Sequence, residues 1–121
     1  RVIPEEQQYS ITVKKDELLE ALKRVSLLVE KSRRIYVELS SDSMTLSSEE
    51  TEVGVAREEI SCEYDGPEER IALNYMYLLE PLRVIDTEDI SIRYSEPNRA
   101  ITIYAVPEKD YFHIVMPMQL D

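Results

Sequence analysis

The stretch YSITVKKDELLEALKRVSLLVEK, residues 9–31, joins a short β-rich segment to a long amphipathic one. Its first five residues alternate apolar and polar side chains, which is typical of a strand. The residues that follow place apolar side chains at the spacing of one helix face: Leu18, Leu22, Val25 and Val29. The stretch therefore predicts a strand that leads directly into an amphipathic helix.

The next part of the chain alternates extended segments and turns. IYVEL (35–39), the turn SSDS (40–43) and MTLSS (44–48) precede a longer extended stretch over 51–64, which ends at the turn DGP (65–67). Short β-rich segments separated by Ser, Asp, Gly and Pro are typical of antiparallel strands joined by turns. A meander is therefore predicted after the first helix.

The same order returns from residue 70. RIAL (70–73) is extended, and NYMYLLEPLRVI (74–85) is helical, with Leu78, Leu82 and Ile85 on one face. Three more strands are predicted in DISIRYS (89–95), AITIYAV (100–106) and YFHIVMPM (111–118). Pro81 lies inside the second helical pattern and removes a backbone donor, so we expect it to kink or shorten that helix.

Two copies of strand, helix and meander predict an α+β domain built from a duplicated β-α-β-β-β unit. Each helix has to bury its apolar face against a sheet, so we expect two helices on one side of an antiparallel sheet. A length of 121 residues and a hydrophobic content of 43% suit a single domain over residues 1–121. Because the chain opens on RVIP without a Met, we also expect it to be a fragment of a longer chain.

The composition limits the classes of partner and compartment. The chain has 25 acidic and 14 basic residues, a formal net charge of −11, which argues against non-specific adhesion to nucleic acid or to an anionic membrane. The lone Cys62 has no partner for an internal disulfide, and no run of 18 apolar residues occurs. We expect an intracellular, cytoplasmic protein with no membrane partner.

The charges are unevenly distributed along the chain. Ten acids and a single base, Arg57, fall between Asp42 and Glu69. Eight of the 14 basic residues fall in the first 34 positions: Arg1, Lys14, Lys15, Lys23, Arg24, Lys31, Arg33 and Arg34. A solvated helix face accounts for such bases without a ligand. The pattern predicts a basic first helix beside an acidic meander.

An apolar pair lies at the end of the first predicted helix. Leu27 falls about 180° from the face of Leu22 and Val25, so it points outward, and Leu28 lies on its flank. A single exposed Leu needs no explanation. A pair beside an open strand edge is a candidate seam for another subunit.

Residues that could carry catalysis are sparse. His113 is the only histidine and alternates with strand neighbours, so we expect a structural or rim role for it. Cys62 lies in a predicted strand without a nearby base. The Glu residues lack metal-ligand spacing, and no Gly-rich phosphate loop occurs. The sequence predicts a non-catalytic protein with no cofactor and no metal.

The chain ends on an apolar run, Ile114 to Met118, although termini are usually polar. Met116 and Met118 form an adaptable apolar patch that suits several partners, and Pro117 does not fit an interior ladder position. The run also fits the core of a last strand, and alternate side chains can serve both purposes. The tail is therefore a candidate binding surface.

The order of the elements, with RVIP at the start, LNYMYLLEPL in the middle and VMPMQL at the end, resembles the C-terminal domain of the bacterial DNA polymerase III β sliding clamp. The resemblance covers essentially the whole chain, and the terminal VMPM is its most specific part. It implies the DNA clamp fold. It also implies the third domain of a protomer that pairs head to tail into a closed ring around duplex DNA.

The resemblance also implies roles for individual residues. The groove for clamp-binding peptides would include Val2, Asn74, Tyr77, Asn98, Ala100, Ile114, Val115, Met116, Pro117 and Met118. The contact with the neighbouring protomer would include Leu27, Leu28, Glu52 and Glu58. The candidates for facing the DNA are Lys23, Arg24, Lys31, Arg33 and Arg34.

The implied partners are double-stranded DNA, the DNA polymerase III alpha subunit, clamp-loader subunits, other clamp-motif proteins, and a second copy in a homodimer. Such a clamp is a non-catalytic processivity factor in DNA replication, and its groove takes its other half from the preceding domain. The residues alone leave two alternatives open. One is a stand-alone acidic interaction module without a DNA role. The other is a small-molecule domain whose eight Tyr and one Phe converge on a closed cavity.

Overall fold

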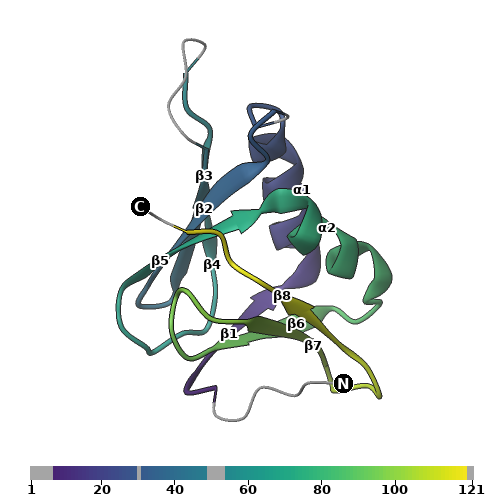
Figure 1. Ribbon diagram of the computed structural model, residues 1–121. Helices are drawn as coiled ribbons and strands as arrows, with labels where there is room; N and C mark the ends of the chain where they lie inside the picture. Colours follow the sequence, from purple (N-terminus) through teal and green to yellow (C-terminus); the bar gives the residue numbers. More distant parts are fainter. Residues whose placement is uncertain (1–6, 30, 49–53, 120–121) are drawn as a thin grey trace.

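The computed structural model describes residues 7–29, 31–48 and 54–119 (Figure 1). Its elements are β1 (Tyr9–Lys14), α1 (Lys15–Ser26), β2 (Arg34–Ser40), β3 (Ser43–Ser47), β4 (Arg57–Ser61), β5 (Glu69–Asn74), α2 (Tyr75–Val84), β6 (Asp89–Tyr94), β7 (Ile101–Val106) and β8 (Phe112–Val115). Each half follows the order strand, helix and three strands. The predicted duplication of a β-α-β-β-β unit in an α+β fold is confirmed.

The strands form two antiparallel four-stranded sheets, and each sheet takes one strand from the other half of the chain. One sheet has the order β1-β6-β7-β8 and the other has the order β4-β3-β2-β5. The first strand of each half therefore pairs with the second strand of the opposite half. Neither half can complete its own sheet alone.

The two halves are related by closely matching contacts. Lys14, the last residue before α1, pairs with Asp89, and Asn74, the last residue before α2, pairs with Arg34. The first amide of each helix donates to a carbonyl of the opposite half: Lys15 to Glu88 and Tyr75 to Arg33, both at 2.9 Å. These bonds satisfy donors that a helix start leaves open.

Isolated bridges join the two sheets at equivalent places. Thr12 of β1 pairs with Glu63, which follows β4, and Ala72 of β5 pairs with Met118, which follows β8. Each half thus ends on a segment that leaves the sheet of its last strand and pairs with the first strand of the same half, which lies in the other sheet. The chain end is tied to the sheet framework in this way.

The two helices lie side by side against the sheets, as expected from the sequence (Figure 1). The buried face of α1 comprises Leu18, Ala21, Leu22 and Val25, and that of α2 comprises Leu78, Leu79, Pro81 and Leu82. The helix α1 ends at Ser26, earlier than the apolar pattern predicts, yet Val29 beyond it is buried. No helix in the described ranges is long and apolar enough to cross a bilayer.

Pro81 is accommodated near the end of α2. This helix has 10 residues against 12 in α1, and it stops three residues after Pro81. The proline nitrogen has no hydrogen to donate, but its carbonyl accepts the last cap bond, from the Ile85 amide at 2.9 Å. The expected effect of Pro81, a shortened second helix, agrees with these bounds.

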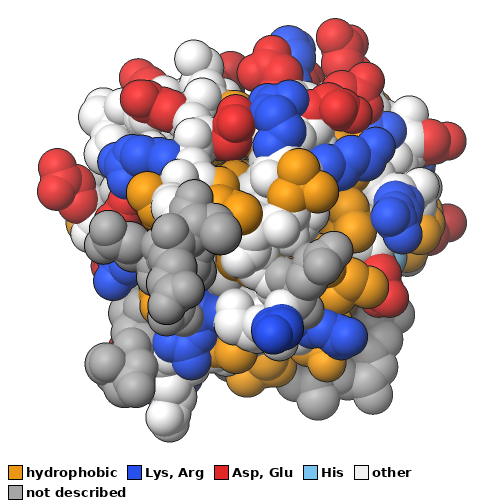
Figure 2. All heavy atoms as spheres, turned by 90° about the horizontal axis from the view of Figure 1, so that it is seen from above, with side chains coloured by type: hydrophobic (Ala, Val, Ile, Leu, Met, Phe, Trp, Pro, Cys, Tyr) orange, Lys and Arg blue, Asp and Glu red, His pale blue; other side chains and the backbone are white. Residues whose placement is uncertain are grey.

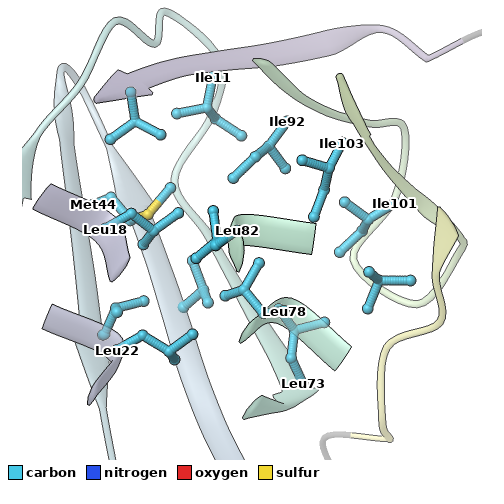
Figure 3. Close-up of a cluster of buried hydrophobic side chains, with 14 of the residues drawn as sticks. Ile11, Leu18, Leu22, Met44, Leu73, Leu78, Leu82, Ile92, Ile101 and Ile103 are labelled. Atoms are coloured by element: carbon cyan, nitrogen blue, oxygen red, sulfur yellow. The ribbon is translucent and has the colours of Figure 1, made fainter. Parts of the chain in front are cut away.

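The core fills the space between the helices and the two sheets. Figure 3 shows Leu78 and Leu82 of α2 between the isoleucines of one sheet and Met44, Leu18 and Leu22 on the other side. A cavity of about 20 Å³, lined only by apolar side chains, remains within it. Such a space holds about one water at most, so it does not support the small-molecule alternative.

A pair of tyrosine hydroxyls is enclosed at the junction of the sheets. The Oη atoms of Tyr64 and Tyr94 lie 2.5 Å apart, and the Tyr64 hydroxyl donates to the carbonyl of Pro67. Burial, followed by the hydrogen bond with Tyr64, raises the pKa of Tyr94 above its ordinary value. The Tyr64 ring reaches this position because Gly66 beneath it has no side chain.

The variant Gly66→Ala is expected to lose stability. A Cβ atom at this position would lie 2.6 Å from Tyr64 Oη and 2.8 Å from its Cε1, so the ring has to move. We expect a loss of about 1–3 kcal/mol in the free energy of unfolding, measured by chemical denaturation. In a Tyr64→Leu background the same change should cost clearly less. An equal cost in both backgrounds would contradict this explanation.

Candidate functional site

An open groove of about 650 Å³ lies between α2 and β8. Its lining comprises Tyr77, Glu80, Pro81, Arg83 and Val84 from the helix, His113, Ile114 and Val115 from β8, and Met116 just after that strand. In Figure 1 these two elements lie next to each other at the front of the molecule. The groove is therefore built entirely by the second half of the chain among the described residues.

One face of α2 forms the first wall. Tyr77, Glu80 and Val84 recur at helical spacing on this face, and Pro81, although buried, also lines the groove. Tyr77 is 56% exposed and Val84 is 61% exposed. Asn74 begins the helix, because its side chain accepts a hydrogen bond from the Met76 amide at 2.9 Å. Asn74 therefore orients this wall without lining the groove.

The end of the chain forms the second wall. Ile114 is 44% exposed and Met116 is 60% exposed, whereas Val115 between them is buried in the core. Pro117 and Met118 are half-buried, and the Met118 amide donates to the Ala72 carbonyl at 2.7 Å. The tail thus serves the core and the surface through alternate residues, as the sequence suggested.

The groove concentrates exposed apolar surface. Seven large hydrophobic side chains are exposed among the described residues, and four of them, Tyr77, Val84, Ile114 and Met116, line it. Contiguous apolar patches of this kind mark interaction sites. Four of the residues predicted for a peptide groove line this one: Tyr77, Ile114, Val115 and Met116. Five further lining residues were not predicted: Glu80, Pro81, Arg83, Val84 and His113. Helical spacing from Tyr77 points to Glu80, Pro81 and Val84.

Two other predicted groove residues are not among the side chains that line this groove. Asn98 and Ala100 belong to the connection between β6 and β7, and neither is part of the described lining. The Ala100 carbonyl instead accepts a hydrogen bond from the Gln7 side chain at 3.3 Å. Val2 lies outside the described residues.

A second apolar site lies where α1 ends. Leu27 is 72% exposed, as its position in the helical pattern predicts, and Leu28 is half-buried beside it. Arg24 donates to Glu58 at 3.0 Å and ties α1 to β4. That hydrogen bond lowers the pKa of the Glu58 carboxyl below its ordinary value.

Val55 is a further exposed residue near this site. It is 54% exposed and precedes β4 at the end that carries Glu58. Its sequence signal is the short apolar run VGVA (53–56) in an acidic stretch, from which no surface contact was predicted. Glu52 lies outside the described residues. Leu27 and Val55 each lie three residues along the chain from one partner of the ion pair between Arg24 and Glu58.

The predicted DNA-facing bases gather around the same end of α1. Lys23 pairs with Glu20 at 3.5 Å, Lys31 and Arg33 are exposed, and Arg34 is half-buried. Arg33 has a φ of 59°, a left-handed backbone conformation that is unfavourable for residues other than Gly. Figure 2 looks down on this end and shows basic side chains among apolar ones, with acidic side chains along one edge.

Comparison with known proteins identifies the family of this fold. The family described as DNA polymerase III beta subunit, C-terminal domain, matches residues 1–119. The chain belongs to this family. The chain is 51% identical over 126 residues to the beta sliding clamp of Treponema pallidum (strain Nichols), a match that covers 100% of this chain and 34% of that protein. The chain thus spans about a third of the length of the relatives it matches.

Solved structures of beta subunits have the same fold. The DnaN sliding clamp of Pseudomonas aeruginosa, in a crystal structure bound to griselimycin, matches with a TM-score of 0.93 and 32% identity over 99% of this chain and 33% of that one. The DNA polymerase III beta subunit of Thermotoga maritima matches with a TM-score of 0.93 and 30% identity, over 100% and 33% of the two chains. The predicted DNA clamp fold is confirmed.

His113 and Cys62, the two residues considered for catalysis, are both half-buried in this domain. His113 makes an edge contact with the Tyr111 ring at 5.8 Å, and its Nε2 atom is buried without a hydrogen-bond partner in the described structure. Cys62 is half-buried, and its amide donates to the Asp42 carbonyl. No group of three or more potential metal ligands occurs among the described residues.

Cys62 should react slowly with thiol reagents. Burial, and next the charge of Asp42, raises the pKa of Cys62 to about 11. At pH 8 we expect alkylation by iodoacetamide to be on the order of a hundredfold slower than in the urea-unfolded chain, because the thiolate is the reactive form. The rate should keep rising up to about pH 11.

The same shift fixes the sign of a stability effect. The folded state holds the Cys62 proton more tightly than the unfolded state. The resulting contribution of the protonated thiol to the free energy of unfolding is therefore fully present below the ordinary thiol pKa. It is lost as the pH rises through about 11. A folded-state alkylation rate that levels off near the ordinary thiol pKa would contradict this assignment.

Proposed function

We propose that this chain is the third domain of a sliding-clamp protomer. Two such protomers form a cytoplasmic ring that encircles duplex DNA and keeps the replicative polymerase on its template. The domain takes no part in chemistry. Membership of the beta-subunit family and the shared fold support this role, and the stand-alone acidic module has no comparable support.

The groove between α2 and β8 is the single observation that carries the proposal. Its four exposed apolar side chains suit a short peptide that seats large apolar residues between a helix and a strand. The proposed occupants are clamp-binding segments of the DNA polymerase III alpha subunit, of clamp-loader subunits and of other clamp-motif proteins. The preceding domain would supply the remaining part of the groove.

The proposed seam with the neighbouring protomer lies at the end of α1. Leu27 and Leu28 offer apolar contact, and Glu58 offers an acidic group on the open edge of the sheet. A charged side chain in place of an interfacial apolar one opposes association. The isolated domain would lack the partner surface and remain monomeric.

The proposed role in holding DNA needs only electrostatics. Exposed bases such as Lys31 and Arg33 attract phosphates without reading bases, so they permit movement along the duplex. The acidic majority of the chain keeps other surfaces from binding nucleic acid. Processivity would follow from ring closure and not from tight binding.

The variant Met116→Ala should weaken peptide binding. We expect roughly a tenfold rise in the dissociation constant of a labelled polymerase-derived peptide, measured by fluorescence anisotropy on the full-length clamp. Sedimentation should show an unchanged dimer, because Met116 is not part of the proposed seam at the end of α1. Unaltered peptide affinity would remove Met116 from the proposed site.

The variant Leu27→Asp should weaken the dimer. The expected result is at least a roughly tenfold rise in the dimer dissociation constant, measured by analytical ultracentrifugation. Peptide binding by each protomer should persist, so this variant and Met116→Ala are controls for each other. A dimer of unchanged stability would remove Leu27 from the proposed seam.

A further inference from the structure

The chain contains four methionines, and their surroundings differ. Met44 is 1% exposed and lies in the core. Met76, at the start of α2, is half-buried and packs against the core. Met118 is half-buried as well, whereas Met116 is 60% exposed. Met116 is therefore the methionine whose sulfur solvent reaches most freely.

The backbone around Met116 is held on both sides. Val115 before it is buried in the core and pairs with Ile101 of β7. Two residues after it, the Met118 amide donates to the Ala72 carbonyl at 2.7 Å. The Met116 side chain thus projects from an anchored segment, and a chemical change at its sulfur leaves the packing of the core untouched.

Met116 differs chemically from the apolar side chains around it. It lines the groove together with Tyr77, Val84 and Ile114, all of which are exposed. Hydrogen peroxide does not attack the hydrocarbon side chains of Val84 and Ile114, but it converts a methionine thioether into a polar sulfoxide. An apolar wall of the groove therefore carries an oxidisable group.

Access to Met116 in the full-length protein follows from the groove's proposed function. The chain spans about a third of the length of its relatives, and further domains surround it in the proposed protomer. A groove that admits a peptide in that protomer also admits hydrogen peroxide, which is far smaller than a peptide.

We propose that Met116 is an oxidation site through which hydrogen peroxide weakens peptide binding. The proposal rests on the proposed function of the groove as a peptide site. The Met116 sulfur attacks one peroxide oxygen with its lone pair, so that an S–O bond forms and the O–O bond breaks. The proton on the transferred oxygen passes to the departing hydroxide, which leaves as water. The thioether loses two electrons, and the peroxide gains them.

The sulfoxide oxygen opposes a bound peptide. It is a hydrogen-bond acceptor that water satisfies while the groove is empty. An apolar peptide side chain seated on Met116 removes that water and supplies no hydrogen bond in its place, which costs binding free energy. Methionine sulfoxide reductases reverse the change, so the site would switch peptide binding off and on.

Tandem mass spectrometry tests the selectivity of the reaction. The full-length clamp is treated with hydrogen peroxide, and digests taken at intervals are analysed for sulfoxide at each methionine. Oxidation of Met116 should be at least about fivefold faster than oxidation of Met76 or Met118, because exposure controls access of the oxidant. The unfolding midpoint in urea should stay the same after Met116 is converted.

Peptide affinity gives the second readout. Conversion of Met116 should raise the dissociation constant of a labelled polymerase-derived peptide at least about tenfold, measured by fluorescence anisotropy. The variant Met116→Leu should have the same dissociation constant before and after peroxide. The variant Met118→Leu keeps Met116 and should lose affinity as the unaltered clamp does. Reductase treatment should restore binding.

The outcomes separate the two proposals. An untreated clamp that does not bind the peptide overturns the proposed peptide site, and the oxidation proposal with it. A clamp that binds equally well before and after full conversion of Met116 overturns the oxidation proposal alone. Faster oxidation of Met76 or Met118, or an equal loss of affinity by Met116→Leu on treatment, also overturns it.

Discussion

The exchange of first strands between the two halves is the constraint on which this fold depends. Strand β1 completes the sheet of the second half, and β5 completes that of the first. The same exchange sets both helix starts, because each first amide finds its acceptor in the opposite half. Helix position, sheet register and the enclosed core are therefore fixed together, and a shift in one register would move all of them.

The groove arises where the two halves differ. In the first half, Arg24 of α1 and Glu58 of the edge strand β4 form an ion pair. In the second half, the equivalent residues are Val84 and His113, which form no ion pair and line open space. Duplication thus supplied two similar helix and strand junctions. One carries an ion pair between helix and strand, and the other has an open groove there.

The sequence predicted the repeating features well because they have local signatures. The apolar stripe of Leu18 and Leu22, its copy at Leu78 and Leu82, and the outward Leu27 all follow from helical spacing. The exchange of β1 and β5 has no such signature, because strand pairing between distant segments depends on the whole chain. Glu80 and Val84 were missed since they look like an ordinary solvent-facing helix surface until β8 is placed beside them.

The hydrogen bond from the Met118 amide to the Ala72 carbonyl connects the segment after β8 to the other sheet. A segment held at both ends loses little conformational entropy when a ligand binds to it. The entropic cost of binding then comes mainly from ordering the ligand. Short peptides that already favour an extended conformation should consequently bind best.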